Sequence, residues 1–534
     1  MFGMVILITM YRVEQKIHGH TYVYEVTSYW DAEKRQARQK RVYIGRKDLK
    51  TGEVVDTKRA SSKPVESLSF GTTCLLKHIS KQIQLTEVLA KIFPEQYKQL
   101  LYLASFKVAT GEPFYLYSYW HETQFLPPEF SLEPQRISEL LASLGGDDKT
   151  IERFFSAWIE QNNKGSAVMF DITSISSYSE NNNLLEYGYN RDKEQIPQIN
   201  LGVISRHSEN DNLPLVYRIY PGSVNDVVTL SNITRMIKEY GLELDSFVLD
   251  RGFYSQENLS QMHKSHLKWL IPLPFRLLLT KDLLVQVEEE IDSPLNAFSY
   301  NNAQIYNHTK RKIHIKNIPC MAHIYLDKPR QVREEEALMQ KIVDFETLFP
   351  KKLFKSLKHA KEYLDETLKS QKRFFSIRKT KERFCLQRNL QEINSERRLL
   401  GKFVICTNNP SYSREQVLTL YRSKDGIEKI FLSFKQELGD RRNRTKSEAT
   451  MRGSIFISFL ALIITTHISR TMADNDLFRK FSKSELLKSL NKLKVFRLAN
   501  EQCLLSEITA RQKEIFLAFN VKKFSDPSYK STEF

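Results

Sequence analysis

Apolar residues recur with different spacings along the chain, and each spacing predicts a different kind of structure. Residues 1–60 contain short runs rich in β-forming residues, such as 22–26 and 41–44, with a turn signal at 50–52. Residues 61–164 instead repeat their apolar positions every three and four residues, which is typical of amphipathic helices. We therefore expect a small β-rich element at the N-terminus, followed by a helical region.

Two of the expected helices are joined by a pair of glycines. Apolar residues at helical spacing fill 137–144, the glycines follow at 145 and 146, and a second apolar series fills 151–158. This arrangement fits a helix-turn-helix shape, although most helical hairpins are only packing units. The region 61–164 is therefore a candidate DNA-binding domain.

The spacing changes again at residue 166. The apolar run 167–170 ends at Asp171, and the run 246–249 ends in the same way at Asp250. Short apolar runs of this kind predict buried strands. Further strands are expected at 200–205, 213–220 and 269–273, with helices at 227–240 and 255–265. The order β-β-β-α-β-α is that of an RNase H-like α/β fold, in which the right-handed crossover makes the strands flanking the first helix parallel.

The rest of the chain completes this core and interrupts it. Residues 165–275 form its first part, 276–400 read as an α+β insertion, and 401–470 resume the core. Residues 471–534 are expected to form a helical C-terminal tail. We expect the sheet of the core to be mixed. The apolar run 455–468 is shorter than the roughly 18 residues that a membrane span needs, so it predicts a buried helix.

Residues 421–435 place four polar side chains on one stripe of an expected helix. At about 100° per residue, Tyr421, Lys424, Glu428 and Lys435 fall within roughly 60° of one another, beside a face of Ile and Phe residues. Taken alone, such a segment is more often a surface helix with an ion pair between Lys424 and Glu428. The two aspartates at strand ends upstream favour a functional role instead.

The charge of the chain favours a nucleic acid as its partner. Its 534 residues include 80 Lys and Arg against 63 Asp and Glu, a net charge of +17. A basic protein of this size is more typical of nucleic-acid binding than of membrane association. The five cysteines show no CxxC pair and no metal-ligand spacing, so we expect reduced packing residues, as in a cytosolic protein.

The spacing of the four polar side chains resembles the Tyr-x2-Arg-x3-Glu-x6-Lys signature of the IS4-type DDE transposases. Lys424 stands where that family has Arg, which keeps the charge but loses the bidentate geometry. The Asp-Arg-Gly-Phe segment at 250–253 is similar to the segment that this family carries at its second Asp, and patterns within 1–60 resemble its IS1634-like branch.

The resemblance implies a role for each of these residues. Asp171, Asp250 and Glu428 would be the catalytic, metal-binding acids, with Mg²⁺ as the cofactor and Mn²⁺ as a substitute. The side chains expected to contact DNA are Tyr421, Lys424, Lys435 and Arg251. Three carboxylates that converge without a neutralising Lys or Arg repel one another, and hard divalent cations relieve that repulsion. Two such ions can activate a water or a 3′-hydroxyl for phosphoryl transfer and stabilise the leaving oxygen.

The same resemblance implies the partners and the setting. The expected partner is double-stranded DNA, as the terminal inverted repeats of an insertion sequence and as target DNA. A homodimer is expected in the synaptic complex, in the prokaryotic cytoplasm at the nucleoid and without a membrane. Two alternatives remain open: a domesticated DNA-binding relative that no longer transposes, and an RNase H-like nuclease specific for DNA structure.

Overall fold

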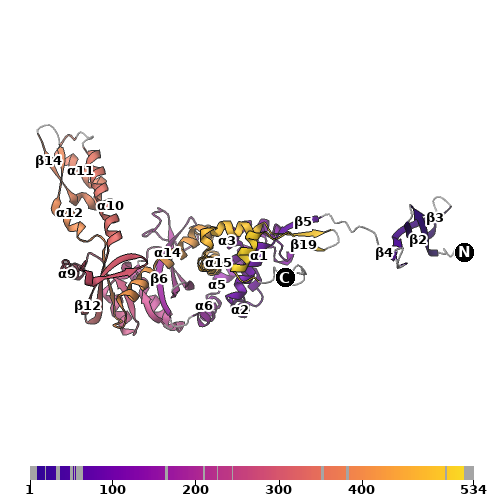
Figure 1. Ribbon diagram of the computed structural model, residues 1–534, viewed down its shortest axis with the longest axis horizontal. Helices are drawn as coiled ribbons and strands as arrows, with labels where there is room; N and C mark the ends of the chain where they lie inside the picture. The colour runs from indigo at the N-terminus through magenta and orange to yellow at the C-terminus, as the bar shows by residue number, and fades with distance from the viewer. Residues whose placement is uncertain are drawn as a thin grey trace.

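The computed structural model describes residues 9–17, 20–31, 36–47, 52, 54–55, 64–162, 166–208, 211–224, 226–242, 244–349, 354–380, 384–498 and 502–521. Figure 1 shows a helical part built around α15 beside a large sheet that contains β6 and β12, with α10 and α11 rising away from that sheet.

One half of the large sheet has the order β8-β7-β6-β9-β10. Its strands are β6 (Ser166–Ser177), β7 (Gln198–Ser208), β8 (Asp211–Pro221), β9 (Leu244–Val248) and β10 (Trp269–Pro272). Strands β6, β7 and β8 are antiparallel, whereas β9 runs parallel to both β6 and β10. Helices α7 (Asp226–Glu239) and α8 (Gln256–Lys264) make the crossovers. This order and these directions confirm the predicted RNase H-like α/β fold with a mixed sheet.

The other half of the sheet is built largely from the predicted insertion. Strand β16 (Lys402–Thr407) pairs antiparallel with β10 on one side and with β13 (Ile318–Asp327) on the other. Strands β12 (Ala303–Ile315) and β11 (Ala297–Tyr300) follow β13 outward. The short strands expected within 276–400 therefore extend the core sheet instead of forming a sheet of their own.

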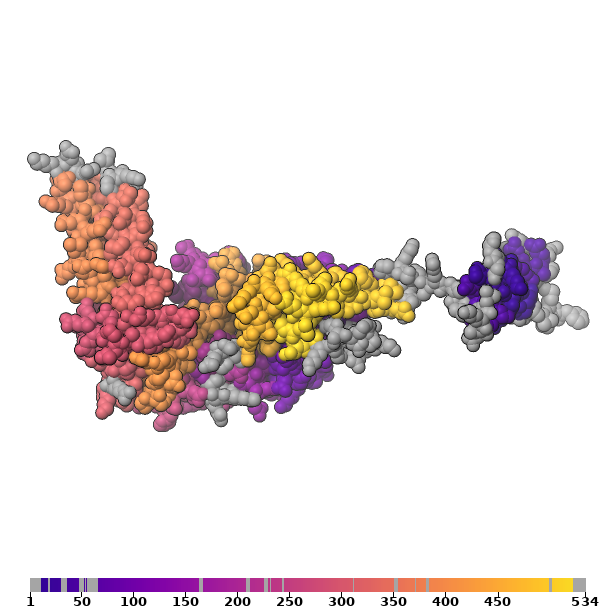
Figure 2. Space-filling view, in the orientation of Figure 1, coloured from indigo at the N-terminus to yellow at the C-terminus, as the bar shows by residue number. Residues whose placement is uncertain are grey.

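The remainder of the insertion forms an arm with a separate apolar core. It comprises α10 (Lys328–Leu348), α11 (Leu357–Leu368), α12 (Leu390–Arg397), β14 (Phe375–Lys379) and β15 (Phe384–Arg388). Its buried side chains are Ile342, Phe345, Phe349, Ala360, Leu364, Phe374, Phe375 and Ile393. Figure 2 shows this arm projecting from the surface of the molecule. Because the arm has its own core, it is able to keep its shape while standing away from the sheet.

Helix α15 (Glu448–Asp474) is the central helix of the helical part of the molecule, which lies beside the large sheet (Figure 1). By length and composition it is the one helix of the described residues that is apolar enough to cross a membrane, but 83% of its most apolar window is buried inside the protein. It packs against α3 (Tyr97–Thr110), α5 (Pro134–Gly146) and β8. The run 455–468 is thus a buried helix, as its sequence predicts.

The remaining N-terminal helices pack together with the C-terminal segment in one continuous core. These elements are α1 (Gly71–Gln82), α2 (Leu85–Ile92), α4 (Tyr117–Glu122), α6 (Asp148–Asn162), α16 (Lys483–Asn491) and α17 (Ala510–Ala518). A small sheet in the order β19-β18-β5 joins the strand before the N-terminal helices to the C-terminal segment. Its strands are β5 (Pro64–Ser69), β18 (Lys494–Leu498) and β19 (Cys503–Leu505), of which the last two were not expected in a helical tail.

The predicted helix-turn-helix corresponds to α5 and α6, whose apolar faces are buried. Leu141 and Leu144 of α5 and Phe154, Phe155 and Trp158 of α6 all belong to the continuous core. The pair therefore has a packing role in this fold, and its contact with DNA stays a prediction.

The first strands form a separate four-stranded antiparallel sheet in the order β1-β2-β3-β4. They are β1 (Thr9–Ile17), β2 (His20–Asp31), β3 (Gln36–Lys47) and β4 (Val54–Val55). Most of β3 is exposed and it is rich in Lys and Arg. The expected boundaries of the N-terminal element, and the other domain boundaries, stay predictions.

Candidate active site

Asp171 and Asp250 are brought together because their strands run parallel. Met169 of β6 pairs with Val248 of β9, and each aspartate follows its paired residue by two positions. Asp250 lies just beyond the end of β9, as expected. Asp171 instead lies inside β6, which continues to Ser177, so the strand end expected at Asp171 is wrong.

The carboxyl group of Asp171 is poorly solvated. Burial is the main reason why its pKa rises to about 7, and the charge of Asp250 acts in the same direction. A hydrogen bond at 2.8 Å from the backbone N–H of Ile172 and the charges of Lys424 and Arg191 oppose that rise. The surroundings of Asp171 therefore disfavour its ionised form, even with the charge of Lys424 nearby.

The segment 421–435 differs from the single helix predicted for it. It runs through the end of α13 (Arg414–Arg422), through α14 (Asp425–Leu432) and into the π-helical turn η7 (Ser433–Glu437). Between α13 and α14 the backbone tightens, since the N–H groups of residues 426 and 427 donate to carbonyls three residues earlier. The tight turn and the π-helical turn both change the direction of the side chains that follow.

The tight turn lies over strand β6. The hydroxyl of Ser423 is 3.9 Å from the sulfur of Met169, which shares a strand face with Asp171. The backbone of the next residue, Lys424, therefore lies close to the part of β6 that carries Asp171. Its Nζ lies 2.9 Å from Oδ2 of Asp250 and 3.2 Å from Oε1 of Glu428.

Lys424 thus lies among the three acids, which corrects the expectation that they converge without a neutralising Lys or Arg. Burial alone lowers the pKa of Lys424, but Asp250, Asp171 and Glu428 outweigh burial and raise it to about 12. The ammonium group is therefore a permanent cation at neutral pH. It links carboxylates from β6, from the end of β9 and from α14 in one electrostatic cluster.

Two other predicted site residues border this cluster. The ring of Tyr421 stacks on Phe403 of β16, with 5.6 Å between ring centroids, and burial raises the pKa of its phenol. The backbone N–H of Arg251 donates to Oδ1 of Asp250 at 2.6 Å, while the residue itself is exposed. Tyr421 is thus held by packing, and Arg251 fixes one oxygen of Asp250 through the main chain.

Lys435 lies apart from this cluster and pairs with a different acid. Its Nζ is 2.5 Å from Oδ2 of Asp192, in the long connection between β6 and β7. Burial lowers the pKa of Lys435, and Asp192 opposes that effect. Lys435 sits in the π-helical turn, which removes it from the stripe that a regular helix would share with Glu428.

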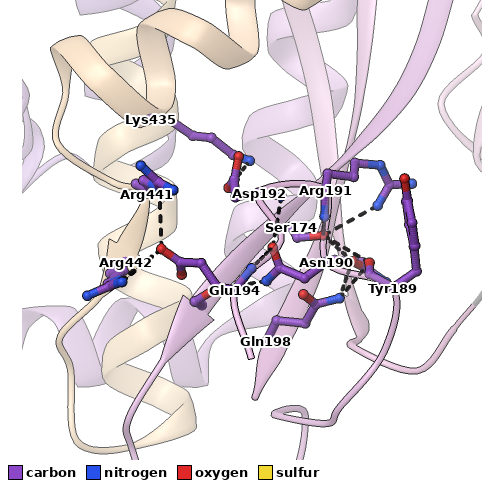
Figure 3. A network of polar contacts seen from close by, with 12 residues as sticks. Ser174, Tyr189, Asn190, Arg191, Asp192, Glu194, Gln198, Lys435, Arg441 and Arg442 are labelled. Atoms are coloured by element: carbon purple, nitrogen blue, oxygen red, sulfur yellow. Dashed lines mark hydrogen bonds and ion pairs between the residues drawn. The ribbon is translucent and has the colours of Figure 1, made fainter. Parts of the chain in front are cut away.

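The same connection carries a second acid that binds the chain just after η7. Glu194 Oε1 lies 2.9 Å from Arg442 and 3.4 Å from Arg441, and its side chain is only 9% exposed. Figure 3 shows Asp192 and Glu194 reaching toward Lys435, Arg441 and Arg442 from one side. We name residues 178–197 the acidic connection, because it neutralises these three cations.

The inner side of the acidic connection is fixed by neutral side chains. Ser174 and Gln198 bond the backbone oxygen of Tyr189, and the side-chain oxygen of Asn190 accepts from the N–H groups of residues 192 and 194. These bonds hold Asp192 and Glu194 in place against the basic segment, by which we mean residues 435–442 with Lys435, Arg441 and Arg442 (Figure 3). Sequence reasoning missed this network, and its only local signal was the length of the connection.

The sequence pattern described as "Transposase DDE domain" matches residues 164–464, more than half of the 534-residue chain. The chain belongs to this transposase family. Among solved structures it is similar to the piggyBac transposase in a synaptic complex with hairpin DNA, at 11% identity and a TM-score of 0.32, covering 86% of this chain and 82% of that chain. A search of curated proteins finds no match.

DDE transposases generally use divalent metal ions, so the donor groups of the cluster need to suit one. Asp171, Asp250 and Glu428 offer the carboxylate oxygens that hard cations prefer, and all three already interact with one cation, the ammonium of Lys424. Within the described ranges, however, no three potential ligand side chains are close enough to form a finished metal cage. The chemistry of the donors fits a divalent ion, and the ammonium of Lys424 now pairs with two of the three acids.

Proposed function

We propose that this DDE transposase serves an insertion sequence of the IS4 type, in the IS1634-like branch, and cleaves and joins DNA at the terminal inverted repeats. The observation that carries this proposal is the convergence of three acids from distant parts of the chain on one cationic position. Asp171, Asp250 and Glu428 come from a strand, a strand end and a helix, which are rigid supports for catalytic groups.

The three acids are the proposed ligands of Mg²⁺, with Mn²⁺ as a substitute. Bound divalent ions would supply activation of a water or a 3′-hydroxyl and stabilisation of the leaving oxygen. The parallel pairing of β6 and β9 fixes the lateral position of the two aspartates. Glu428 is more exposed than Asp250, with 59% of its side chain exposed against 29%.

The proposed DNA contacts surround the acids. Lys424 and Lys435 are suited to phosphates as point charges, Arg251 projects from an exposed position, and Tyr421 borders the cluster on a packed ring. Lys435 contacts a phosphate only after it leaves Asp192. The substrate would be double-stranded DNA, paired by a homodimer in the prokaryotic cytoplasm at the nucleoid.

The test is cleavage of labelled DNA that carries the repeats flanking the coding sequence. Full-length protein in Mg²⁺ should cut at the repeat ends, and Asp171→Ala, Asp250→Ala and Glu428→Gln should reduce the rate by at least about 10³-fold while leaving binding of the repeat intact. Asp425→Asn is the matched control, because Asp425 is an exposed carboxylate on the same helix as Glu428.

Other results would point elsewhere. Near wild-type cleavage by Asp250→Ala in saturating Mg²⁺ would show that the acids are misassigned. Binding of the repeat without cleavage by the wild-type protein would favour a domesticated relative. Cleavage of branched DNA regardless of the terminal sequence would favour a structure-specific nuclease.

A further inference from the structure

Lys424 holds the position that a metal ion would need. Its Nζ lies 2.9 Å from Asp250 and 3.2 Å from Glu428, and it also attracts the carboxylate of Asp171. Its side chain is only 22% exposed. An ordinary surface ion pair between residues four apart on a helix engages one acid, whereas this ammonium contacts Glu428 on its own segment and also Asp250 just beyond β9, and the charge of Asp171 attracts it as well.

The ammonium and a divalent ion exclude each other at this position. A Mg²⁺ ion takes its oxygen ligands at about 2.0–2.1 Å, so it would compete with Nζ for Oδ2 of Asp250 and Oε1 of Glu428. Two cations that share those oxygens would also repel each other. Lys424 has to leave before the three acids are able to close around an ion.

The position of Lys424 in the chain makes that departure feasible. It lies in the tight turn between α13 and α14 and not within either helix. Its unbranched stem of four carbons is able to carry the charge outward without moving the backbone. Beside the acids, the outward position is where a DNA phosphate would be bound in the proposed function.

We propose that Lys424 is an internal counter-ion that keeps the three acids together before metal binding and then moves to the DNA backbone. The inference rests on the proposed function of the site. It assigns Lys424 two successive partners, first the carboxylates and then a phosphate. Metal loading and phosphate binding are thereby coupled through one side chain, and Lys424 acts as a positioning residue, not a catalytic one.

The test measures Mn²⁺ binding to the full-length protein without DNA, by calorimetry or by the spin-resonance signal of free Mn²⁺. Lys424→Met removes the charge and keeps an unbranched side chain, so it should bind Mn²⁺ at least about fivefold more tightly than wild type. Lys424→Arg keeps the competing cation and should bind no more tightly than wild type. Lys429→Met removes an equal charge from an exposed position of α14 and should change the affinity less than about twofold.

A second measurement tests whether Lys424 contacts a DNA phosphate once a divalent ion is bound. Binding of a repeat-end duplex is measured across a salt series, with Ca²⁺ or with a chelator. The salt slope of the wild-type protein should exceed that of Lys424→Met by about one in Ca²⁺ and by much less in chelator. Circular dichroism and a thermal melt show whether each variant is folded.

The outcomes separate this inference from the function on which it rests. Unchanged or weaker Mn²⁺ binding by folded Lys424→Met overturns the counter-ion role, and so does equal tightening by Lys424→Arg. If wild-type protein binds no Mn²⁺, or binds it equally well after Asp250→Asn, then the metal site itself is wrong. If Mn²⁺ binding depends on Asp250 but not on Lys424, only the further inference fails.

Discussion

At the scale of single residues, the candidate site contains a buried carboxylate that lowers the stability of the fold when it is ionised. Asp171 is placed where burial penalises its ionised form, and its raised pKa is the sign of that penalty. Because the pKa of Asp171 is higher in the folded than in the unfolded protein, protonation of this carboxyl stabilises the folded state. The stabilisation is complete at pH values below the unfolded pKa, which is near 4. That stabilisation is lost as the pH rises through about 7.

Asp171→Asn should therefore stabilise the metal-free protein, and should do so more at high pH. In a chelating buffer, the difference in melting temperature between the variant and wild type should be larger at pH 8 than at pH 5. Thermal melts at several pH values check this, with Asp425→Asn as the exposed control. An equal difference at both pH values would mean that burial does not govern Asp171. A variant that gains stability and loses cleavage is typical of a functional residue whose native side chain destabilises the fold.

At the scale of elements, the acidic connection and the basic segment after α14 form a pair. Asp192 and Glu194 neutralise Lys435, Arg441 and Arg442, which are cations suited to a DNA backbone. In the proposed function, phosphates of the DNA would take the place of these two acids. Any DNA that uses these cations has to replace the carboxylates first.

Asp192→Asn should make DNA binding tighter. Freed from its carboxylate, Lys435 is able to neutralise one phosphate, so the salt slope should rise by about one and the affinity at low salt by roughly threefold or more. Glu180→Gln removes an equal charge from an exposed site of the same connection and serves as the control. Binding is measured on one repeat-end duplex across a salt series. Equal effects of both variants would mean that only net charge matters.

Much of the core could be predicted from the sequence, because the signals were local. The strand runs that lead to Asp171 and Asp250 are short and apolar, and their order along the chain sufficed for the RNase H-like fold. The end of β6 was misplaced because polar residues after Asp171 continue the strand, with Ile172 and Ile175 buried in the core. A change of polarity was taken for the end of a strand.

The parts that could not be predicted depend on contacts between distant residues. Lys435 and Asp192 are 243 positions apart, and no local pattern links them. The π-helical turn at Ser433–Glu437 has no sequence signal comparable to a glycine or a proline. The central place of Lys424 was also missed, because its pairing with Asp250 depends on the tight turn between α13 and α14.

At the scale of the whole molecule, close packing between α5 and α15 ties the N-terminal helices to the transposase core. A side chain at Gly145 would place its Cβ 1.8 Å from the backbone oxygen of Ala449, and one at Gly453 would lie 2.0 Å from that of Leu141. The two helices therefore meet backbone to backbone. The candidate DNA-binding region and the core are thus closely packed at this contact.

Gly145→Ala should destabilise the protein by about 1–3 kcal/mol or more, because the clash is with a backbone atom that has no rotamer to change. Gly146→Ala is the matched control on the same helix, since nothing lies within 4 Å of its added Cβ. The control should be neutral or slightly stabilising, as alanine restricts the unfolded chain. Denaturant melts of the two variants give the comparison, and similar losses in both would contradict the close contact.

The small sheet of β5, β18 and β19 affects how the protein folds during synthesis. Strand β5 ends at Ser69 and its partner β18 begins at Lys494, so the ribosome adds roughly 425 residues between them. At about 5–20 residues per second, β5 waits on the order of 20–90 s for its partner. The first helices to emerge thus cannot complete their fold until synthesis is nearly finished. Until then the edge of β5 that later pairs with β18 has no partner, and an unpaired strand edge of this kind favours aggregation.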